Sequence, residues 1–283
     1  MKYAAGKWDR IFATLKTRFE DEKNPTYGAL ICRKSAEAEA PDRYVAVIDC
    51  RGDKLSRRFF TRWHEIAHRL TTHCDTSEPV YRSEHDPIER MMDEIAGHIG
   101  FYEPIFDPAF QRAREGGPLL TFGMVESILG GSFPAASFQS TLFACARRLT
   151  IPLVYLEAAL AHKKDVKRRL QTPSMFGDEP PAGELRAVRV IPNHVAQRES
   201  FTIPTNMRVP ADSVIHRRFY ADPRSECDGR EDLSQWESRG RPLEPRAVIV
   251  EARKVSNLVV AIVQPLEASR GKRPVASRPM FRE

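Results

Sequence analysis

The sequence predicts an α+β protein of two domains: a mainly helical domain that also holds a small sheet, and a smaller β-rich domain. Up to about residue 170, apolar residues recur every three or four positions, which is the period of amphipathic helices. After residue 186, short runs of β-branched and aromatic residues alternate with proline-rich and charged connections. Residues 172–186 are rich in proline, glycine and acidic side chains, as linkers are. We therefore predict domains at 1–171 and 187–268, followed by a flexible basic tail at 269–283.

The composition is that of an ordinary globular protein, with 283 residues, 41% of them hydrophobic and 29% charged. No apolar run approaches the roughly 20 residues that a membrane-spanning helix needs, and the N-terminal segment meets charge too early for a secretion signal. The five cysteines are scattered and odd in number, which favours reduced thiols. These features predict a cytoplasmic protein without a membrane partner. The net charge of +6 favours polyanionic partners, and a solvated basic surface explains it equally well.

The first domain opens with a predicted helix at 7–23 and two predicted strands at 27–32 and 44–49. A turn follows at 51–53, and Ser56 is a suitable N-cap for the next helix. We expect that helix to bury one stripe of apolar side chains, formed by Phe60, Trp63, Ala67 and Leu70.

This helix carries His64-Glu65-Ile66-Ala67-His68, a His-Glu-x-x-His pattern. Residues four apart lie nearly one above the other on a helix, so His64 and His68 can share one metal ion. Glu65 follows the first ligand and is placed to act as a general base. The pattern therefore predicts a catalytic zinc site.

A third ligand is needed, because a catalytic zinc ion typically has three protein ligands. Asp86-Pro87 predicts the start of another helix, with Asp86 as N-cap, and Glu89 lies in its first turn. Glu89 is the predicted third ligand, and Asp93 one turn later is placed to hydrogen-bond a ligating histidine. Glu89 also fits a capping box with Asp86, which would explain it without a metal.

Two motifs of this chain resemble those of ImmA/IrrE-type metallopeptidases. The segment from Arg58 to His68, with its Phe-Thr-x-x-His-Glu-x-x-His core, resembles the start of that family's active site. The segment from Glu89 to Ala96 resembles the family's second helix, which carries the third ligand. The motifs occur in the family's order and spacing, and the resemblance covers roughly residues 20–170.

The resemblance implies a gluzincin-like metallopeptidase domain in which His64, His68 and Glu89 bind Zn²⁺ and Glu65 is the general base. It implies a small helical subdomain at about 132–171 and, on the IrrE-like branch, a GAF-like sensor domain at 187–268. The implied substrate is a helix-turn-helix repressor protein, whose cleavage derepresses stress, DNA-damage or antiphage defence genes. Single-stranded DNA is the activator that we expect from the sensor domain together with the basic charge.

Several residues near the motifs are candidates for supporting roles. A second donor to the oxyanion could come from His73, Tyr81, His85, Tyr102 or a main-chain amide. His73 and Cys74 could instead occupy the open metal position in a resting state.

The remaining predictions concern the chain after the metal site. We predict a loop at 114–118, helices at 137–149 (capped by Ser137, with Cys145 in the core) and 153–170, and strands at 187–191, 200–203, 213–220, 247–252 and 258–264. A basic run ends the second helix and could contact DNA phosphates, although a solvated helix end explains it too. Its members are Lys163, Lys164, Lys167, Arg168 and Arg169.

Two other classes of function are compatible with these residues. The chain could be a DNA- or ligand-binding regulator whose metal is structural, although a structural zinc normally has four protein ligands and no fourth is evident. It could also be a component of a toxin–antitoxin or phage-type system that acts by holding a partner protein.

Overall fold

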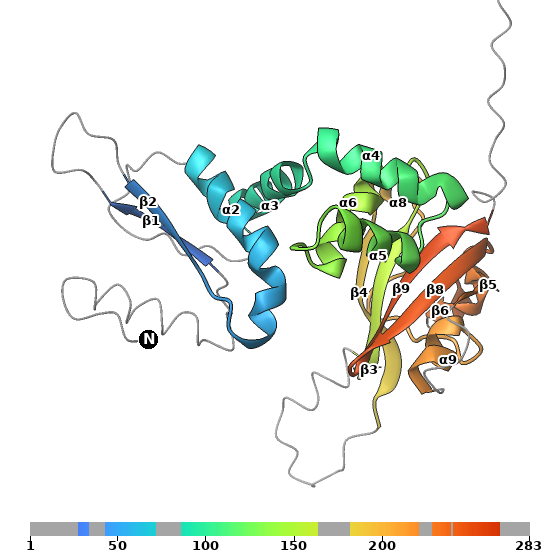
Figure 1. The fold of residues 1–283 in the computed structure, drawn as a ribbon. Helices are drawn as coiled ribbons and strands as arrows, with labels where there is room; N and C mark the ends of the chain where they lie inside the picture. Colours follow the sequence, from blue (N-terminus) through green and yellow to red (C-terminus); the bar gives the residue numbers. More distant parts are fainter. Residues whose placement is uncertain are drawn as a thin grey trace, which may run out of the picture. The chain divides into compact units, whose positions relative to one another are not determined.

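A computed structural model describes residues 28–33, 43–71, 86–163, 182–220, 228–238 and 240–266 (Figure 1). The predicted helix at 7–23 and the predicted tail at 269–283 lie outside these residues. The chain divides into two compact units: Met1–Ala113 with Val125–Ala144, and Arg114–Met124 with Cys145–Glu283. The predicted α+β class is confirmed at the level of mixed helices and antiparallel sheets.

The first unit contains the two predicted strands, which form a hairpin. Strand β1 (Gly28–Arg33) pairs antiparallel with β2 (Arg43–Ile48), with Gly28 opposite Ile48. A short 3-10 helix, η1 (Gly52–Arg57), then leads directly into α2 (Arg58–Thr71). The prediction that Ser56 caps this helix is therefore wrong, because Ser56 lies inside η1 and the chain is already helical there.

Helix α2 buries a stripe that shares only Ala67 with the predicted one. Its buried residues are Phe59, Thr61, Glu65 and Ala67, whereas Leu70 is 67% exposed and Phe60 and Trp63 are half-buried. The reason is that α2 packs against two partners, the β1–β2 hairpin and helix α3 (Pro87–Gly100). Because α2 has packing partners on two sides, its buried residues do not follow a single apolar stripe.

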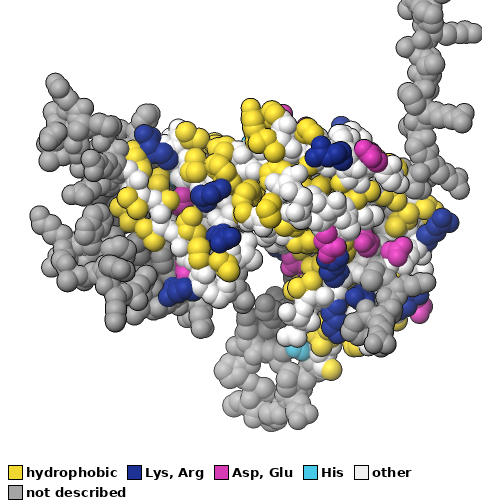
Figure 2. Space-filling view, viewed as in Figure 1, with side chains coloured by type: hydrophobic (Ala, Val, Ile, Leu, Met, Phe, Trp, Pro, Cys, Tyr) yellow, Lys and Arg dark blue, Asp and Glu magenta, His cyan; other side chains and the backbone are white. Residues whose placement is uncertain are grey.

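Exposed basic side chains lie along one face of α2. Figure 2 shows Lys and Arg side chains spaced over the part of the surface that the hairpin and α2 form. Arg58, Arg62 and Arg69 of α2 are exposed. Arg69 also stacks its guanidinium on the ring of Tyr44 in β2, so part of this face borders the hairpin.

Helix α3 begins as the sequence predicts. The backbone N–H of Ile88 donates to Asp86 Oδ1 at 2.8 Å, and Pro87 occupies the first turn. Helices α4 (Glu103–Ala113) and α5 (Phe122–Gly131) were not predicted, and the predicted loop at 114–118 begins with a short 3-10 helix, η2 (Arg114–Gly116). The sequence did not predict α4 because it contains Pro104 and Pro108, and proline disfavours a helix interior. Pro104 is tolerated because first-turn N–H groups have no partner within the helix.

Aromatic side chains form the core of the first unit. Phe101 lies 5.4 Å from Phe59, 5.3 Å from Phe106 and 5.5 Å from Phe133, measured between ring centroids. This cluster joins the start of α2 to the end of α3. The contacts between these buried rings therefore help to position α2 relative to α3. The rings lie apart from the polar side chains of the two helices.

Helix α6 (Phe138–Arg148) confirms the predicted helix at 137–149. The backbone N–H of Ser140 donates to Ser137 Oγ at 3.1 Å, so Ser137 caps the helix as predicted. Cys145 is fully buried, and burial raises the pKa of its thiol to about 12. Cys145 is therefore an inert core residue.

The second unit is built on a five-stranded antiparallel sheet (Figure 1). The strand order is β4-β3-β9-β8-β5, so the first strand in sequence lies between the second and the last. The strands are β3 (Val154–Ala161), β4 (Glu184–Pro192), β5 (Asp228–Asp232), β8 (Ala247–Val255) and β9 (Leu258–Pro265). The strands predicted at 187–191, 247–252 and 258–264 are confirmed.

Strand β3 corrects both a predicted helix and the predicted domain boundary. Residues 154–161 form a strand, not part of a helix at 153–170, and they pair with β4 on one side and β9 on the other. The apolar run here is compatible with both periods, and pairing on two sides decides for the strand. Residues assigned to the helical subdomain at 132–171 therefore belong to the sheet, and β4 begins inside the predicted linker at 172–186.

Two further strand predictions are wrong. Residues 200–203 form no strand, and residues 214–220 form helix α9 (Val214–Tyr220) instead. The β-branched and aromatic side chains of this segment favoured a strand. The helix forms because Ser213 Oγ accepts from the N–H of His216 at 3.0 Å and because Val214 and Ile215 are buried in the core. The short helix α8 (His194–Arg198), the 3-10 helix η3 (Leu233–Gln235) and strands β6 (Glu237–Ser238) and β7 (Arg241–Pro242) complete the described elements.

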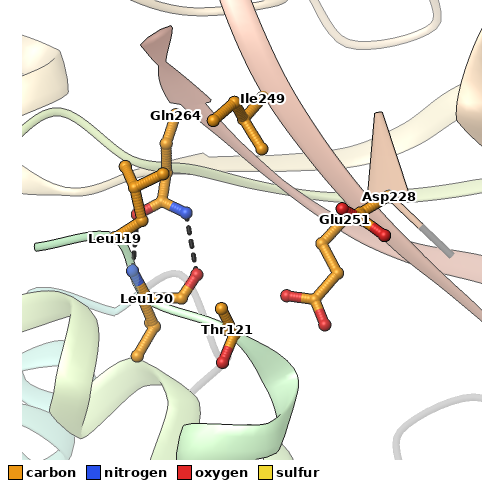
Figure 3. A pocket seen from close by; sticks show the side chains of 7 residues that line it. All are labelled: Leu119, Leu120, Thr121, Asp228, Ile249, Glu251 and Gln264. Atoms are coloured by element: carbon orange, nitrogen blue, oxygen red, sulfur yellow. Dashed lines mark hydrogen bonds between the residues drawn. The ribbon is translucent and has the colours of Figure 1, made fainter. Parts of the chain in front are cut away.

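Buried polar side chains in this unit bind the backbone. Asn193 accepts from the N–H groups of Leu153 and Ala196 and donates to the carbonyls of Ala146 and Ile151. Gln264 accepts from Leu120 N at 2.9 Å and donates to Leu120 O at 2.8 Å, beside a small hollow that Asp228 and Glu251 also line (Figure 3). Glu251 accepts from the N–H of Phe122 at 2.9 Å. These side chains fasten loops and helix ends to the sheet.

None of the described helices has the length and apolar character needed to cross a membrane.

Candidate metal centre

The candidate metal residues lie where α2 and α3 run antiparallel to each other. His68 faces Glu89 near the start of α3, His64 reaches Asp93 one turn later, and Trp63 meets Gly100 at the end of α3. A Cβ added to Gly100 would lie 2.7 Å from Trp63 Cδ1, so a glycine lets the two helices approach closely. The contacts between α2 and α3 bring the three predicted ligands together.

Three ligand atoms converge on one point. His64 Nε2 lies 3.2 Å from His68 Nε2 and 3.1 Å from Glu89 Oε2, and His68 Nε2 lies 3.4 Å from Glu89 Oε2. Zinc bonds to nitrogen or oxygen of about 2.0–2.1 Å place two tetrahedral ligand atoms about 3.3 Å apart. The three separations therefore match one face of a zinc tetrahedron. Among the described residues, this is the one group of three or more His, Cys, Asp or Glu side chains so arranged.

Asp93 orients His64 as predicted. Its Oδ1 lies 2.8 Å from His64 Nδ1. An ionised carboxylate can only accept a hydrogen bond, so Nδ1 carries the proton and, in a neutral ring, Nε2 presents its lone pair. This is the arrangement by which a carboxylate fixes the tautomer of a metal-ligating histidine. The capping-box alternative for Glu89 does not explain why its Oε2 faces two imidazoles.

The titration of these groups reflects their mutual contacts. Burial by itself lowers the pKa of His64, but its hydrogen bonds with Asp93 and Glu89 outweigh burial and raise that pKa to about 9. The hydrogen bonds of His64 and His68 lower the pKa of Glu89 to about 2. In the metal-free protein a proton on His64 therefore supplies the positive charge that the surrounding carboxylates favour. A bound cation would replace that proton.

Glu65 is the most buried member of the group, with an exposure of 5%. Burial raises the pKa of Glu65, and the positive charge of the neighbouring histidines only partly opposes this. A carboxyl group with a raised pKa accepts and returns protons closer to neutral pH than an exposed one does. Its carboxylate lies against the backbone of β1 at Gly28.

The other predicted site residues are not part of this group. His73, Cys74, Tyr81 and His85 lie outside the described residues, as do Lys164, Lys167, Arg168 and Arg169. Tyr102 is 58% exposed and lines a different hollow, together with Trp63, His98 and Ile105. Lys163 is exposed and follows strand β3, so it does not end a helix.

Sequence reasoning missed the part that the hairpin plays in this site. Gly28 was predicted only as part of a strand, yet its backbone approaches Glu65 more closely than a side chain would permit. A glycine at the start of a predicted strand is the signal that could have found it, because glycine within strands often marks a close approach.

A comparison with models of known protein families found no match, and a comparison with curated protein sequences also found none. The resemblance to ImmA/IrrE-type peptidases therefore rests on the two sequence motifs alone.

Proposed function

We propose that the chain is a zinc-dependent endopeptidase. The observation that carries this proposal is the convergence of His64 Nε2, His68 Nε2 and Glu89 Oε2 at separations of 3.1–3.4 Å. Three protein ligands leave a tetrahedral ion one open position, which distinguishes catalytic from structural zinc. When bound, zinc would activate a water molecule and polarise the scissile carbonyl.

The protein's own residues have separate tasks in this reaction. Glu65 takes a proton from the attacking water and passes it to the leaving amine, a role that suits its raised pKa. Asp93 holds the proton on His64 Nδ1 and so keeps Nε2 free for the metal. The burial of Glu65 excludes bulk water from the carboxylate.

The substrate follows from the motif resemblance alone. We propose a helix-turn-helix repressor as the substrate, a cytoplasmic setting, and a sensor role for the second unit with single-stranded DNA as its activator. The free thiols Cys50 and Cys145 support a reducing compartment.

The test uses the chain stripped of metal by a chelator and then titrated with zinc. We expect one zinc ion per chain, and cleavage of a mixed quenched-fluorescent peptide pool or of a helix-turn-helix protein only after zinc is added. His68→Ala should lose both zinc and cleavage. Zinc binding without cleavage of any probe, with or without single-stranded DNA, would favour a regulator with a structural metal.

A further inference from the structure

The backbone of β1 touches the carboxylate of Glu65 at a position without a side chain. A Cβ added to Gly28 would lie 2.5 Å from Glu65 Oε1 and 2.6 Å from Thr61 Cγ2. Gly28 has an ordinary extended backbone, and it is not one of the described glycines with positive φ. The need for glycine here is therefore a need for space and not for an unusual conformation.

The hairpin that carries Gly28 is held firmly against α2. Arg69 of α2 places its guanidinium 4.0 Å from the ring centroid of Tyr44 in β2, and both strands pack along the helix. Thr61 and Glu65, which face Gly28, are themselves buried. An added methyl group therefore meets its neighbours at once, and the most flexible neighbour must move.

That neighbour is the carboxylate of Glu65. Its Oε1 is the far end of a flexible side chain, whereas the strand and the helix are fixed by their packing. Moving this oxygen from 2.5 Å to an ordinary van der Waals separation of 3.4 Å requires a shift of about 1 Å. A displacement of about 1 Å at a reacting group costs on the order of 100-fold in rate.

We propose that Gly28 is a positioning residue for the general base, so that the missing side chain of β1 sets where the carboxylate of Glu65 lies. This inference rests on the proposed peptidase function. Gly28 contacts neither the metal ligands nor a substrate in this role. It acts through Glu65, and zinc binding should not depend on it.

The test compares zinc-loaded full-length Gly28→Ala with wild type and with Gly130→Ala. Gly130 lies in helix α5, and nothing outside the neighbouring helix backbone lies within 4 Å of a Cβ added there, which makes it a matched control. We expect Gly28→Ala to lower kcat about 100-fold on a peptide that the wild type cleaves, with KM and zinc content unchanged. Gly130→Ala should retain wild-type kcat.

A second measurement does not depend on activity. With ¹³C-labelled glutamate, the carboxyl resonance of Glu65 can be assigned by its loss in Glu65→Gln. We expect that resonance to move in Gly28→Ala and to stay in place in Gly130→Ala. If the chain cleaves no peptide, the proposed function fails, but this spectrum still tests whether Gly28 positions the carboxylate.

Thr61→Ser separates the two contacts, because it removes Cγ2 and leaves Glu65 in place. If Gly28→Ala folds poorly, the double variant Gly28→Ala/Thr61→Ser should restore folding while kcat stays low. Full recovery of kcat in the double variant would overturn the proposal, because the contact with Thr61 would then explain the loss. An unmoved Glu65 resonance in Gly28→Ala would overturn it as well.

Discussion

Two sets of polar side chains, one in each unit, make different kinds of hydrogen bond. In the second unit, Asn193 and Gln264 direct their amides at backbone groups. In the first unit, His64 directs its ring nitrogens at Asp93, Glu89 and His68. Amides that bind the backbone hold the fold together. Side chains that converge on one another leave ligand atoms for something else to bind, so the candidate metal site lies in the first unit.

The largest expected effect is a loss of the proposed cleavage activity while the fold of the first unit stays intact. Glu65→Gln should keep zinc, because Glu65 is not a ligand, and should lower the cleavage rate by roughly 100- to 10,000-fold, the usual contribution of a general base. Zinc content and steady-state kinetics measure the two effects. Cleavage that persists in this variant contradicts the assigned mechanism.

The next effect is a loss of stability caused by a substitution in the second unit. Asn193→Ala removes hydrogen bonds to four backbone groups, including the N-cap of α8, and should destabilise the protein by about 3 kcal/mol. Chemical denaturation measures this loss. Gln197→Ala on the same helix removes one exposed hydrogen bond and should cost less than about 0.5 kcal/mol. Similar losses in both variants would remove the distinction between buried and exposed amides.

A smaller effect sharpens the role of Asp93. Asp93→Asn keeps a hydrogen-bond acceptor for His64 Nδ1 but removes the negative charge, so zinc affinity should fall about 10- to 100-fold. Competition with a chromophoric chelator measures it. Glu94→Gln, on the same helix, serves as the control and should leave zinc affinity unchanged.

The smallest effect is a pH dependence of the metal-free protein. The pKa of His64 is raised from 6.5 to about 9, so its stabilising contribution is complete below about pH 6.5 and is lost as the pH rises through about 9. The pKa of Glu89 is lowered from 4.5 to about 2, so its contribution is present above pH 4.5 and is lost as the pH falls through about 2. Melting curves of chelator-treated protein should therefore shift down between pH 6.5 and 9.

Bound zinc should oppose the loss of stability that we expect between pH 6.5 and 9. Metal binding requires unprotonated imidazoles, so the stabilisation by zinc should increase as the pH rises over the same range. A stability of the metal-free protein that is flat from pH 6 to 9 would contradict the hydrogen bonds assigned to His64.

Local sequence signals predicted α2 and α3, which carry the candidate ligands, and also α6. The His-Glu-x-x-His spacing, the Asp86-Pro87 helix start and the Ser137 cap each act within a few residues, and the structure contains α2, α3 and α6 where those signals lie. Asp93 was predicted to contact a histidine from its place one turn after Glu89, and it does. Side chains at fixed spacings on a helix keep their relative directions in any fold.

Other features depended on residues far apart in the chain. The run at 154–161 satisfies a helical period and a strand period alike, and only β4 and β9 on its two sides make it a strand. The segment at 214–220 has the composition of a strand, but burial of Val214 and Ile215 in the core and the cap from Ser213 make it a helix.

By itself, the sequence determined which side chains share the faces of α2 and α3 that carry the candidate ligands, because that follows from helix geometry alone. Only the tertiary structure decided that the three ligand atoms approach to 3.1–3.4 Å, because this depends on how α2 packs against α3. The contact between Gly28 and Glu65 was also decided by the tertiary structure alone. It depends on the packing of the hairpin against α2, which cannot be predicted from the spacing of residues within one element.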